Sequence, residues 1–334
     1  MAGRGLDRFH GRSVNVFFTF ADSSTYQSPP SSLAGPSPRM MAKKSTKAPT
    51  NEVPSLADLR REIDRIDEAM HALLIERGEI IDRLIRAKRT SETGSAFRPA
   101  REAAMMRRLV ERHRGILPLD TAESIWRVII STFTYVQAPF SVHADLSAGE
   151  PGMRDSARFH FGFTVPFVGH LGAAGVVAAI AASQGDLGLV PAVATSGSGA
   201  WWTALEGENN PKIIARLPFV ERSDHPAGLP VFAVARPHPD AIVTDVKVWS
   251  VGISGWGPKT AQAVMPLADV TAVPQGAFDG AALLISVPQG RDIAEITAAL
   301  TRAGGSVRRE ALVGSHATRY TVSADGARPV PTGR

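Results

Sequence analysis

The sequence predicts a multidomain protein. A region of three helices comes first, an α/β region follows, and a small α+β module of the regulatory type ends the fold. A run of apolar residues from Leu56 to Leu84, alternately three and four residues apart, is typical of a long packed helix. After Pro139, short apolar runs alternate with Gly/Pro turns, which favours mixed α/β structure. A strand–helix–strand–strand order after residue 280 indicates the small module.

The composition is that of an ordinary globular protein and narrows the possible chemistry. Of the 334 residues, 44% are hydrophobic and 21% are charged. The chain has no cysteine, which excludes disulfides, thiol catalysis and cysteine-ligated metal, and fits a cytoplasmic protein. Nine histidines are scattered without an H-E-x-x-H or other metal-ligand spacing, so we expect no metal and no cofactor.

Residues 1–53 are expected to be a disordered N-terminal extension. Residues 1–54 carry seven basic and three acidic residues, so most of the net charge of +5 lies there, in a solvated tail rather than a nucleic-acid site. The apolar run Val14–Ala21 is too short to span a membrane, and no other segment is apolar enough. Met40 and Met41 precede a short basic stretch and are alternative starts to Met1.

The first predicted helix begins after Ser55, with Asp58 completing a capping-box-like pair, and runs to about Arg89. A helix of this length is a rod of about 50 Å. A domain of this size cannot cover both sides of the rod with its own chain, so the sequence predicts a homodimer through this helix. The apolar seam that needs a partner consists of Leu56, Leu59, Ile63, Ile66, Met70, Leu73, Ile80 and Leu84.

Two shorter helices complete the helical region, residues 54–140. Pro99 suits the first turn of the second helix, which is expected to end near Arg114 before Gly115. Asp120 and Glu123 have the spacing of a capping box and predict the start of the third helix, which ends before Pro139. Its apolar row is Ile125, Ile129 and Phe133.

The rest of the chain divides into a polar linker (141–157), an α/β region (158–278), a small module (279–325) and a disordered tail (326–334). In the α/β region we expect strands at 161–168, 187–190, 213–217 and 230–235, and helices at 172–183 and from 201. In the module we expect strands at 281–288, 306–313 and 318–323, and a helix at 292–303.

Arg77 occupies a position in the seam of the first helix where an apolar residue is expected. Arginine stays charged at physiological pH, and burying the charge is costly unless an anion meets it. Lys88 lies three helical turns further on the same stripe, and Gln137 continues the apolar row of the third helix. The anion is supplied either by the protein or by a ligand.

Three more polar residues lie near these positions: Arg60 near the first turn of the first helix, and Arg101 and Glu102 at the start of the second. Together they describe a pocket for a small polyanion. Taken singly, Lys88 is an ordinary lysine at a helix end and Gln137 an ordinary polar residue at one. The alternative for the cations is pairing across a dimer with acids of the first helix, namely Asp64, Glu68 or Glu79.

The pattern of these residues over 56–138 closely resembles the all-helical chorismate mutases. The resemblance rests on Leu59-Arg60-x-x-Ile63-Asp64-x-Ile66-Asp67, Leu73-Leu74-x-x-Arg77, Ala87-Lys88, Arg101-Glu102 and Gln137. It implies an intertwined three-helix dimer that converts chorismate, a dicarboxylate, to prephenate without a cofactor. In that family's positions, Arg77 and Arg60 bind the two carboxylates, with Arg60 donated across the dimer. Lys88 and Gln137 then bond the ether oxygen.

The resemblance further implies that Glu102 accepts a hydrogen bond from the ring hydroxyl, with Arg101 beside the site. The sequence departs from the family at two places. Phe97–Ala100 stands where some relatives carry an aspartate, and Phe133 stands where some carry a small polar residue.

The C-terminal half looks like part of a prephenate dehydratase followed by its small regulatory domain. The similarity lies in Phe163–Val165, Gly185–Pro191, Trp202–Leu205 and residues 281–323. The family's Thr-Arg-Phe motif is absent near Gly228–Phe232, Ala192–Ala194 replaces Glu-Asn-Ser, and the Gly-Pro-x-Gly-Thr opening is missing. We therefore expect a degenerate, structural or ligand-sensing remnant.

The sequence thus predicts a cytoplasmic chorismate mutase of aromatic amino-acid biosynthesis. One alternative keeps the fold but cleaves isochorismate to salicylate and pyruvate. The other is a non-catalytic regulator that dimerises through the helical region and senses an aromatic amino acid. No nucleic-acid or membrane partner is expected.

Overall fold

The computed structural model describes residues 54–88, 96–193, 199–237, 245–276 and 280–322. The expected N-terminal extension and the C-terminal tail lie outside these residues. The chain divides into two units, residues 1–59 and 60–334. Within the first unit the predicted cap is confirmed: the Asp58 amide donates to the Ser55 hydroxyl (3.2 Å), and the Ser55 amide donates to the Asp58 carboxylate (3.1 Å).

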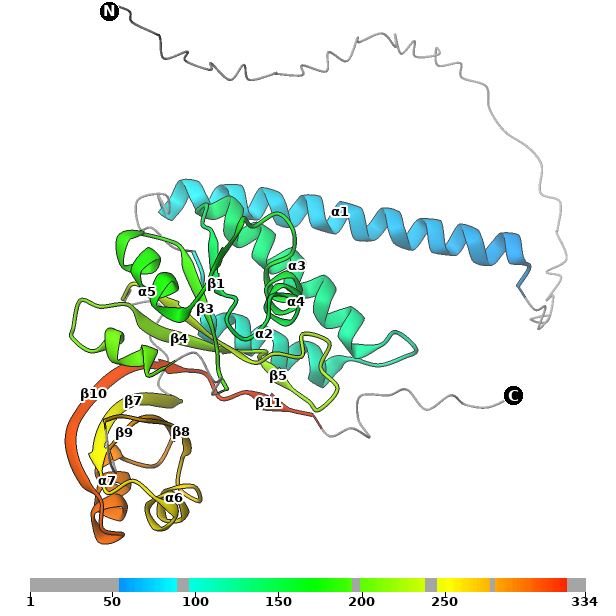
Figure 1. Cartoon of the computed structure of the whole chain (residues 1–334). Coiled ribbons are helices and arrows are strands. Elements are labelled where there is room, and N and C mark those ends of the chain that lie inside the picture. The colour runs from blue at the N-terminus through cyan, green and yellow to red at the C-terminus, as the bar shows by residue number, and fades with distance from the viewer. Residues whose placement is uncertain (1–53, 89–95, 194–198, 238–244, 277–279, 323–334) are drawn as a thin grey trace, which may run out of the picture. The chain divides into compact units, whose positions relative to one another are not determined.

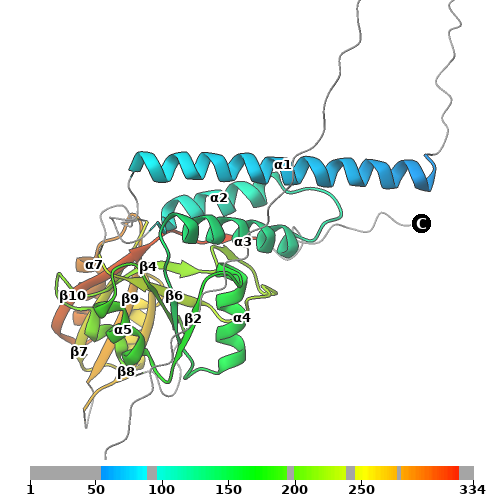
Figure 2. The same cartoon turned by 90° about the horizontal axis from the view of Figure 1, so that it is seen from above.

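The three predicted helices are confirmed as α1 (Leu56–Lys88), α2 (Pro99–Arg112) and α3 (Leu119–Gln137), shown in Figure 1. The predicted cap of the third helix is wrong. The helix begins after Pro118 without a side-chain cap, because Glu123 turns into the core and contacts Arg222 instead. In Figure 2, α2 and α3 lie between α1 and a large sheet.

Strands and helices are mixed along the rest of the described chain. In order they are β1 (Val142–Asp145), α4 (Glu150–Phe161), β2 (Phe167–His170), α5 (Ala173–Ala182), β3 (Leu187–Pro191), the 3-10 helix η2 (Trp201–Leu205), β4 (Lys212–Leu217), β5 (Val220–Glu221), β6 (Val231–Ala235), β7 (Val246–Ser254), α6 (Pro258–Val264), β8 (Asp269–Pro274), β9 (Ala281–Pro288), α7 (Ile293–Arg302), β10 (Ser306–His316) and β11 (Tyr320–Thr321).

Among the described residues, nine strands form one sheet in the order β2-β1-β3-β6-β4-β10-β7-β9-β8. The first three strands are parallel, β4 and β10 are also parallel, and the remaining neighbours are antiparallel. β5 and β11 pair separately. The described part of the chain after residue 140 is therefore a mixed α/β fold, as its composition predicts.

Several boundaries differ from the prediction. Residues 141–157 are not a linker but contain β1 and most of α4, and the strand expected from residue 161 begins at Phe167. β1 is short and half polar in sequence, so its pattern is weak although three of its four residues are buried. β7, α6 and β8 were not predicted. The division expected between residues 278 and 279 separates β8 from β9, which are hydrogen-bonded neighbours.

The sheet and the helices α2 and α3 share one hydrophobic core. Successive residues of β3 point to opposite faces, because side chains alternate along a strand. Leu189 packs in a cluster with α4, and Val190 packs in a cluster with α5 and η2. The cluster on the α4 side also contains Met106 of α2 and Ile130 of α3. The helices α2 and α3 are therefore packed on the α/β region.

Gly314 is required where the two parts of the sheet meet. β10 and β4 are parallel neighbours in the sheet, and Gly314 lies opposite Ile213 where they meet. A Cβ atom at Gly314 would lie 2.1 Å from the Ile213 carbonyl oxygen, and its φ of 152° is one that other residues rarely adopt. A side chain at this position would therefore push the two strands apart.

Two of the histidines that the structure describes are buried in ways that disfavour protonation. Burial lowers the pKa of His160 well below its usual value, and the electrostatic influence of Arg127 and of His225 acts in the same direction. Burial likewise lowers the pKa of His316 to about 4. The His316 Nδ1 atom lies 2.9 Å from the Ala317 carbonyl oxygen, so this nitrogen carries the proton of the neutral ring.

The protein should lose stability as the pH falls from 7 to 5. The unfolded chain binds a proton at each of these histidines near pH 6.5, whereas the folded chain does not bind one at His316 until about pH 4. This difference lowers the free energy of unfolding by about 2 kcal/mol for His316 alone. Urea unfolding at both pH values measures the loss. His316→Gln should flatten the pH dependence, whereas His71→Gln, on the exposed surface of α1, should leave it unchanged.

Candidate functional site

A pocket of about 110 Å³ lies between the second half of α1, the start of α2 and the second half of α3. Four of the six predicted site residues line it: Arg77, Arg101, Glu102 and Gln137. The remaining lining residues are Ile81, Leu84, Ala96, Arg98, Met105, Ile130, Phe133 and Thr134. Apolar and polar side chains therefore share the walls, and polar groups that converge on a pocket with apolar walls are typical of a small-ligand site.

Arg77 enters the pocket from α1 half-buried, with its guanidinium 5.3 Å from the centre of the Phe133 ring. Burial lowers its pKa, and the positive charge of Arg101 lowers it further. Within the described part of the chain no carboxylate forms an ion pair with Arg77, so Asp64, Glu68 and Glu79 do not pair with it in one subunit. Arg77 and Arg101 are thus neighbouring cations of the pocket that an anion would stabilise.

Gln137 lies at the last turn of α3. Its side-chain amide donates to the Phe133 carbonyl oxygen at 2.9 Å, one turn back in the same helix. A glutamine amide has two N–H donors and a carbonyl acceptor, so capacity for a ligand remains. Phe133, the departure noted in the sequence, forms the aromatic wall on which Arg77 rests.

Glu102 lies in the first turn of α2 and is 4% exposed. Its Oε2 atom accepts a hydrogen bond from the Nη1 atom of Arg127 at 2.7 Å. A carboxylate can accept several hydrogen bonds, so this contact leaves acceptor capacity. Arg101 is exposed beside it and faces the same pocket.

Of the other two predicted residues, the structure places only Arg60, which lies away from this pocket. Arg60 is exposed on α1, seventeen residues before Arg77, a separation of about 25 Å along a helix. The side chain of Lys88 lies outside the described residues. Arg60 can therefore reach a site of this kind only on another copy of the chain.

Sequence reasoning missed Arg98 and Arg127. Arg98 lines the pocket just before α2, where its Nη1 atom donates to the Phe97 carbonyl oxygen at 3.1 Å. Arg127 was not singled out in the sequence, although it is fully buried in α3. The pattern that indicates its burial is the i, i+4 spacing of Glu123, Arg127 and Ser131, which places three polar groups on one face of an otherwise apolar helix.

The sequence predicted that the row Ile125, Ile129 and Phe133 is the buried face of α3. This prediction is wrong. Ile125 is exposed, and the other two are only partly buried. The face that carries Arg127 is buried instead, because α3 packs against α4 there.

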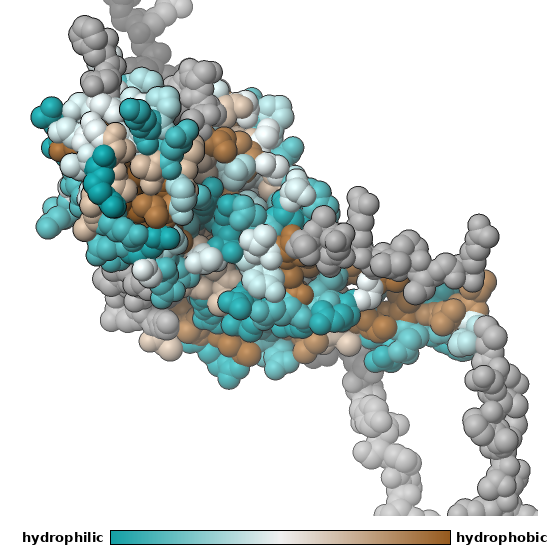
Figure 3. Space-filling model, turned by 90° about the horizontal axis from the view of Figure 1, so that it is seen from below, coloured by the Kyte–Doolittle hydropathy of each residue, from teal (hydrophilic) through white to brown (hydrophobic). Residues whose placement is uncertain are grey.

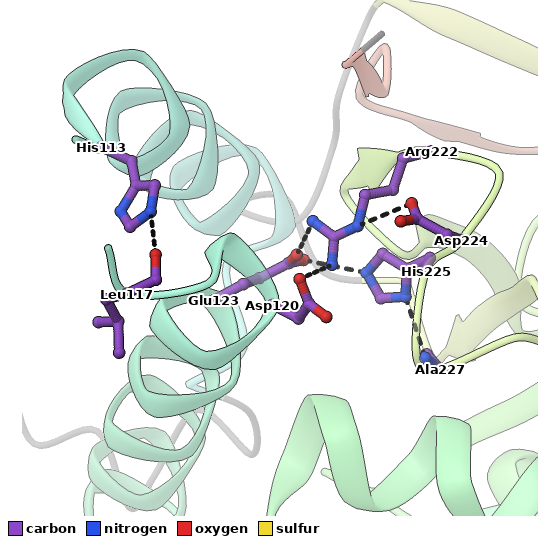
Figure 4. Close-up of polar contacts among 8 residues, drawn as sticks. All are labelled: His113, Leu117, Asp120, Glu123, Arg222, Asp224, His225 and Ala227. Atoms are coloured by element: carbon purple, nitrogen blue, oxygen red, sulfur yellow. Dashed lines mark hydrogen bonds and ion pairs between the residues drawn. The ribbon is translucent and has the colours of Figure 1, made fainter. Parts of the chain in front are cut away.

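A second polar cluster joins the start of α3 to the segment after β5, and Figure 4 shows its side chains. Glu123 accepts from Arg222 and contacts the Nε2 atom of His225, both at 3.3 Å. The Ala227 amide donates to the Nδ1 atom of His225, so the ring proton lies on Nε2 and points to Glu123. Asp120 and Asp224 lie 3.6 and 3.7 Å from the Arg222 guanidinium.

This cluster is a structural one. Its arginine faces carboxylates of the protein, so the cluster offers no cation without a partner to an anionic ligand. Arg77 in the α1–α3 pocket lacks such a partner within the described residues. The pocket is therefore the better candidate for a functional site. The described residues contain no group of three or more acidic, histidine or cysteine side chains that could hold a metal ion.

The pocket residues lie within a segment that matches a known family. Residues 59–138 match the family described as chorismate mutase type II. Over 103 residues the chain is 31% identical to a bifunctional chorismate mutase/prephenate dehydratase of Neisseria gonorrhoeae (strain ATCC 700825 / FA 1090). The matched segment is 31% of this chain and spans only 27% of that relative. Residues 59–138 are thus a chorismate mutase type II domain, which confirms the resemblance seen in the sequence.

Two solved structures are similar to about half of the chain at low levels. One, described as a novel type of quorum quenching acylase, GqqA, has a TM-score of 0.35 and 11% identity over 54% of this chain and 95% of its own. The other, prephenate dehydratase from Streptococcus mutans, has a TM-score of 0.30 and 9% identity over 53% and 97%. TM-scores this low do not establish a common fold, and the dehydratase resemblance stays a prediction.

None of the helices that the structure describes is both long enough and apolar enough to cross a membrane.

Glu123→Gln should destabilise the fold strongly, because it leaves the buried Arg222 charge without its buried partner. We expect a loss of about 3–5 kcal/mol in the free energy of unfolding, measured by urea denaturation. Glu111→Gln removes the partner of Arg107 in an exposed pair of α2 and should cost about 0.5 kcal/mol or less. Equal losses in the two variants would contradict the structural role of the cluster.

Proposed function

We propose that this protein is a chorismate mutase and that the α1–α3 pocket is its active site. The observation that carries the proposal is Arg77, a half-buried cation without a carboxylate partner in the described chain, beside a second cation. The pocket lies within the segment that matches the mutase family. Chorismate carries two carboxylates, so it would supply the anion that the pocket lacks.

The reaction needs little from the protein beyond geometry and charge. Rearrangement of chorismate to prephenate is a unimolecular pericyclic step, without a nucleophile or a proton transfer. Catalysis then consists of holding the reactive conformer and stabilising the charge that develops on the breaking ether oxygen. The product feeds the biosynthesis of phenylalanine and tyrosine.

The predicted catalytic residues and the polar residues Arg101 and Glu102 have distinct roles in this proposal. Arg77 binds one substrate carboxylate, and Gln137 donates to the ether oxygen together with Lys88. Glu102 accepts a hydrogen bond from the ring hydroxyl. Arg101 keeps the mouth of the pocket positive, which favours entry of a dianion.

The active form in this proposal is a homodimer through α1. Hydrophobic surface gathers along this helix in the space-filling view of Figure 3. An uncovered stripe of this extent is typical of a surface that binds a partner. A second α1 would cover the stripe and carry its own Arg60 toward this pocket. The exposed apolar residues are Leu56, Leu59, Ile63, Ile66, Met70, Leu73, Leu74, Ile75 and Ile80.

Arg77→Ala should reduce kcat/KM for chorismate by roughly a hundred- to a thousandfold, the scale for losing one oriented donor to a developing charge. The measurement is the loss of chorismate absorbance. Arg108→Ala, on the exposed surface of α2, should behave as wild type.

Equal rates in wild type and Arg77→Ala would refute the role of Arg77. Wild-type protein that leaves chorismate unchanged but releases pyruvate from isochorismate would be a lyase on the same fold. Protein that acts on neither substrate would favour the non-catalytic regulator.

Substituting charged residues for apolar ones in the exposed apolar stripe of α1 should abolish both the dimer and the activity. Ile66→Lys combined with Met70→Lys places two charges among apolar residues, so we expect the mass from light scattering to fall to that of one chain. Ile116→Lys changes an apolar residue that is 93% exposed in the α2–α3 connection, and it should leave the mass unchanged.

Shared active sites would appear in mixed dimers. Arg60→Ala and Arg77→Ala should each be inactive alone. Their co-expression should restore about a quarter of wild-type activity, because half of the dimers are mixed and each of these has one intact site. Absence of any recovery would mean that both arginines act within one chain or that no dimer forms.

A further inference from the structure

Arg127 is a fully buried cation in the middle of α3, and it contacts three parts of the chain. Its Nη1 atom donates to Oε2 of Glu102 at 2.7 Å, and its Nη2 atom donates to the backbone oxygen of His160 at 3.1 Å. Its guanidinium also lies 5.3 Å from the centre of the Phe219 ring. One side chain therefore links the first turn of α2 to the last turn of α4.

The contact with Glu102 connects Arg127 to the pocket. Glu102 lines the pocket, but Arg127 is not among the lining residues and meets no ligand there. A buried carboxylate is free to adopt several rotamers unless a partner selects one. The bond from Arg127 selects one, and the bond from Arg127 to His160 fixes the arginine in turn.

Arginine is the residue type suited to this task. Its planar guanidinium presents several donors in a fixed fork, so two acceptors can be held in one geometry. A lysine would keep the positive charge but offers a compact ammonium on a flexible stem, and cannot reproduce the fork.

We propose that Arg127 is a positioning residue of the active site. It holds the Glu102 carboxylate where the ring hydroxyl of the substrate binds, and it ties that position to α4 in the α/β region. The proposal rests on the proposed mutase function. It assigns to the α/β region a part in completing the helical pocket, through the backbone of His160.

A purely structural ion pair is the alternative, and the chain offers a matched control for it. Arg222 is also a buried arginine paired with a buried glutamate of α3, Glu123. That pair joins the helices to the α/β region as Arg127 does, but neither of its residues lines the pocket. A change at Arg222 therefore tests the consequences of weakening the fold at this boundary without touching Glu102.

The experiment compares full-length wild type, Glu102→Gln, Arg127→Lys, Arg222→Lys and the double variant Glu102→Gln/Arg127→Met in steady-state chorismate turnover. Arg127→Lys should lower kcat roughly ten- to a hundredfold. Its effects on kcat and on KM should stand in the same ratio as those of Glu102→Gln. The double variant should match Glu102→Gln within about twofold, because Arg127 acts only through Glu102. Arg222→Lys should melt at a lower temperature yet keep wild-type kcat.

Three results would overturn the inference while leaving the mutase function intact. They are a folded Arg127→Lys variant with wild-type kcat, a double variant much slower than Glu102→Gln, or an equal loss of kcat in Arg222→Lys. If Arg127→Lys does not fold, the double variant still decides, because it removes both buried charges together. Wild-type protein without turnover would instead refute the proposed function itself.

Discussion

Pairing of the charges buried on α3 is the constraint on which the rest of the structure depends. Two charged residues of this helix, Glu123 and Arg127, lie where the helix packs against the α/β region. Each costs several kcal/mol to bury unless a partner meets it. The partners come from distant segments, Arg222 after β5 and Glu102 in α2. The helices therefore reach this arrangement only together with the sheet on which they pack.

Paired and unpaired charges divide the molecule into structural and functional parts. Around Glu123 the buried cation Arg222 meets carboxylates of the protein, and the cluster joins two regions. Arg77 has no carboxylate partner within the described chain, and it faces a pocket together with Arg101. A folded chain tolerates this imbalance because the pocket is open to water, and a bound anion would then replace water as the partner of the guanidinium. Glu102 belongs to both parts, since it lines the pocket and pairs with Arg127.

Local patterns predicted most of the elements and part of the pocket. The 3-and-4 spacing, Pro99 and Gly115 predicted the helices, and runs such as 187–190 predicted buried strands that the structure contains. Arg77 and Gln137 were found because each breaks an apolar row. β1 and α4 were missed because their sequences are half polar, and polarity in a short segment reads as a linker until the sheet that buries it is known.

The sequence by itself determined the three helices, the exposed apolar stripe of α1 and the cation within it, because each depends on residues a few positions apart. Only the tertiary structure decided which face of α3 is buried, that α2 and α3 share a core with the sheet, and that Glu102 is held by Arg127. These features depend on contacts between residues from 25 to about a hundred positions apart. Helical periodicity shows that one face of a helix differs in polarity from the others. Tertiary packing decides which neighbour covers that face and what charge the neighbour brings.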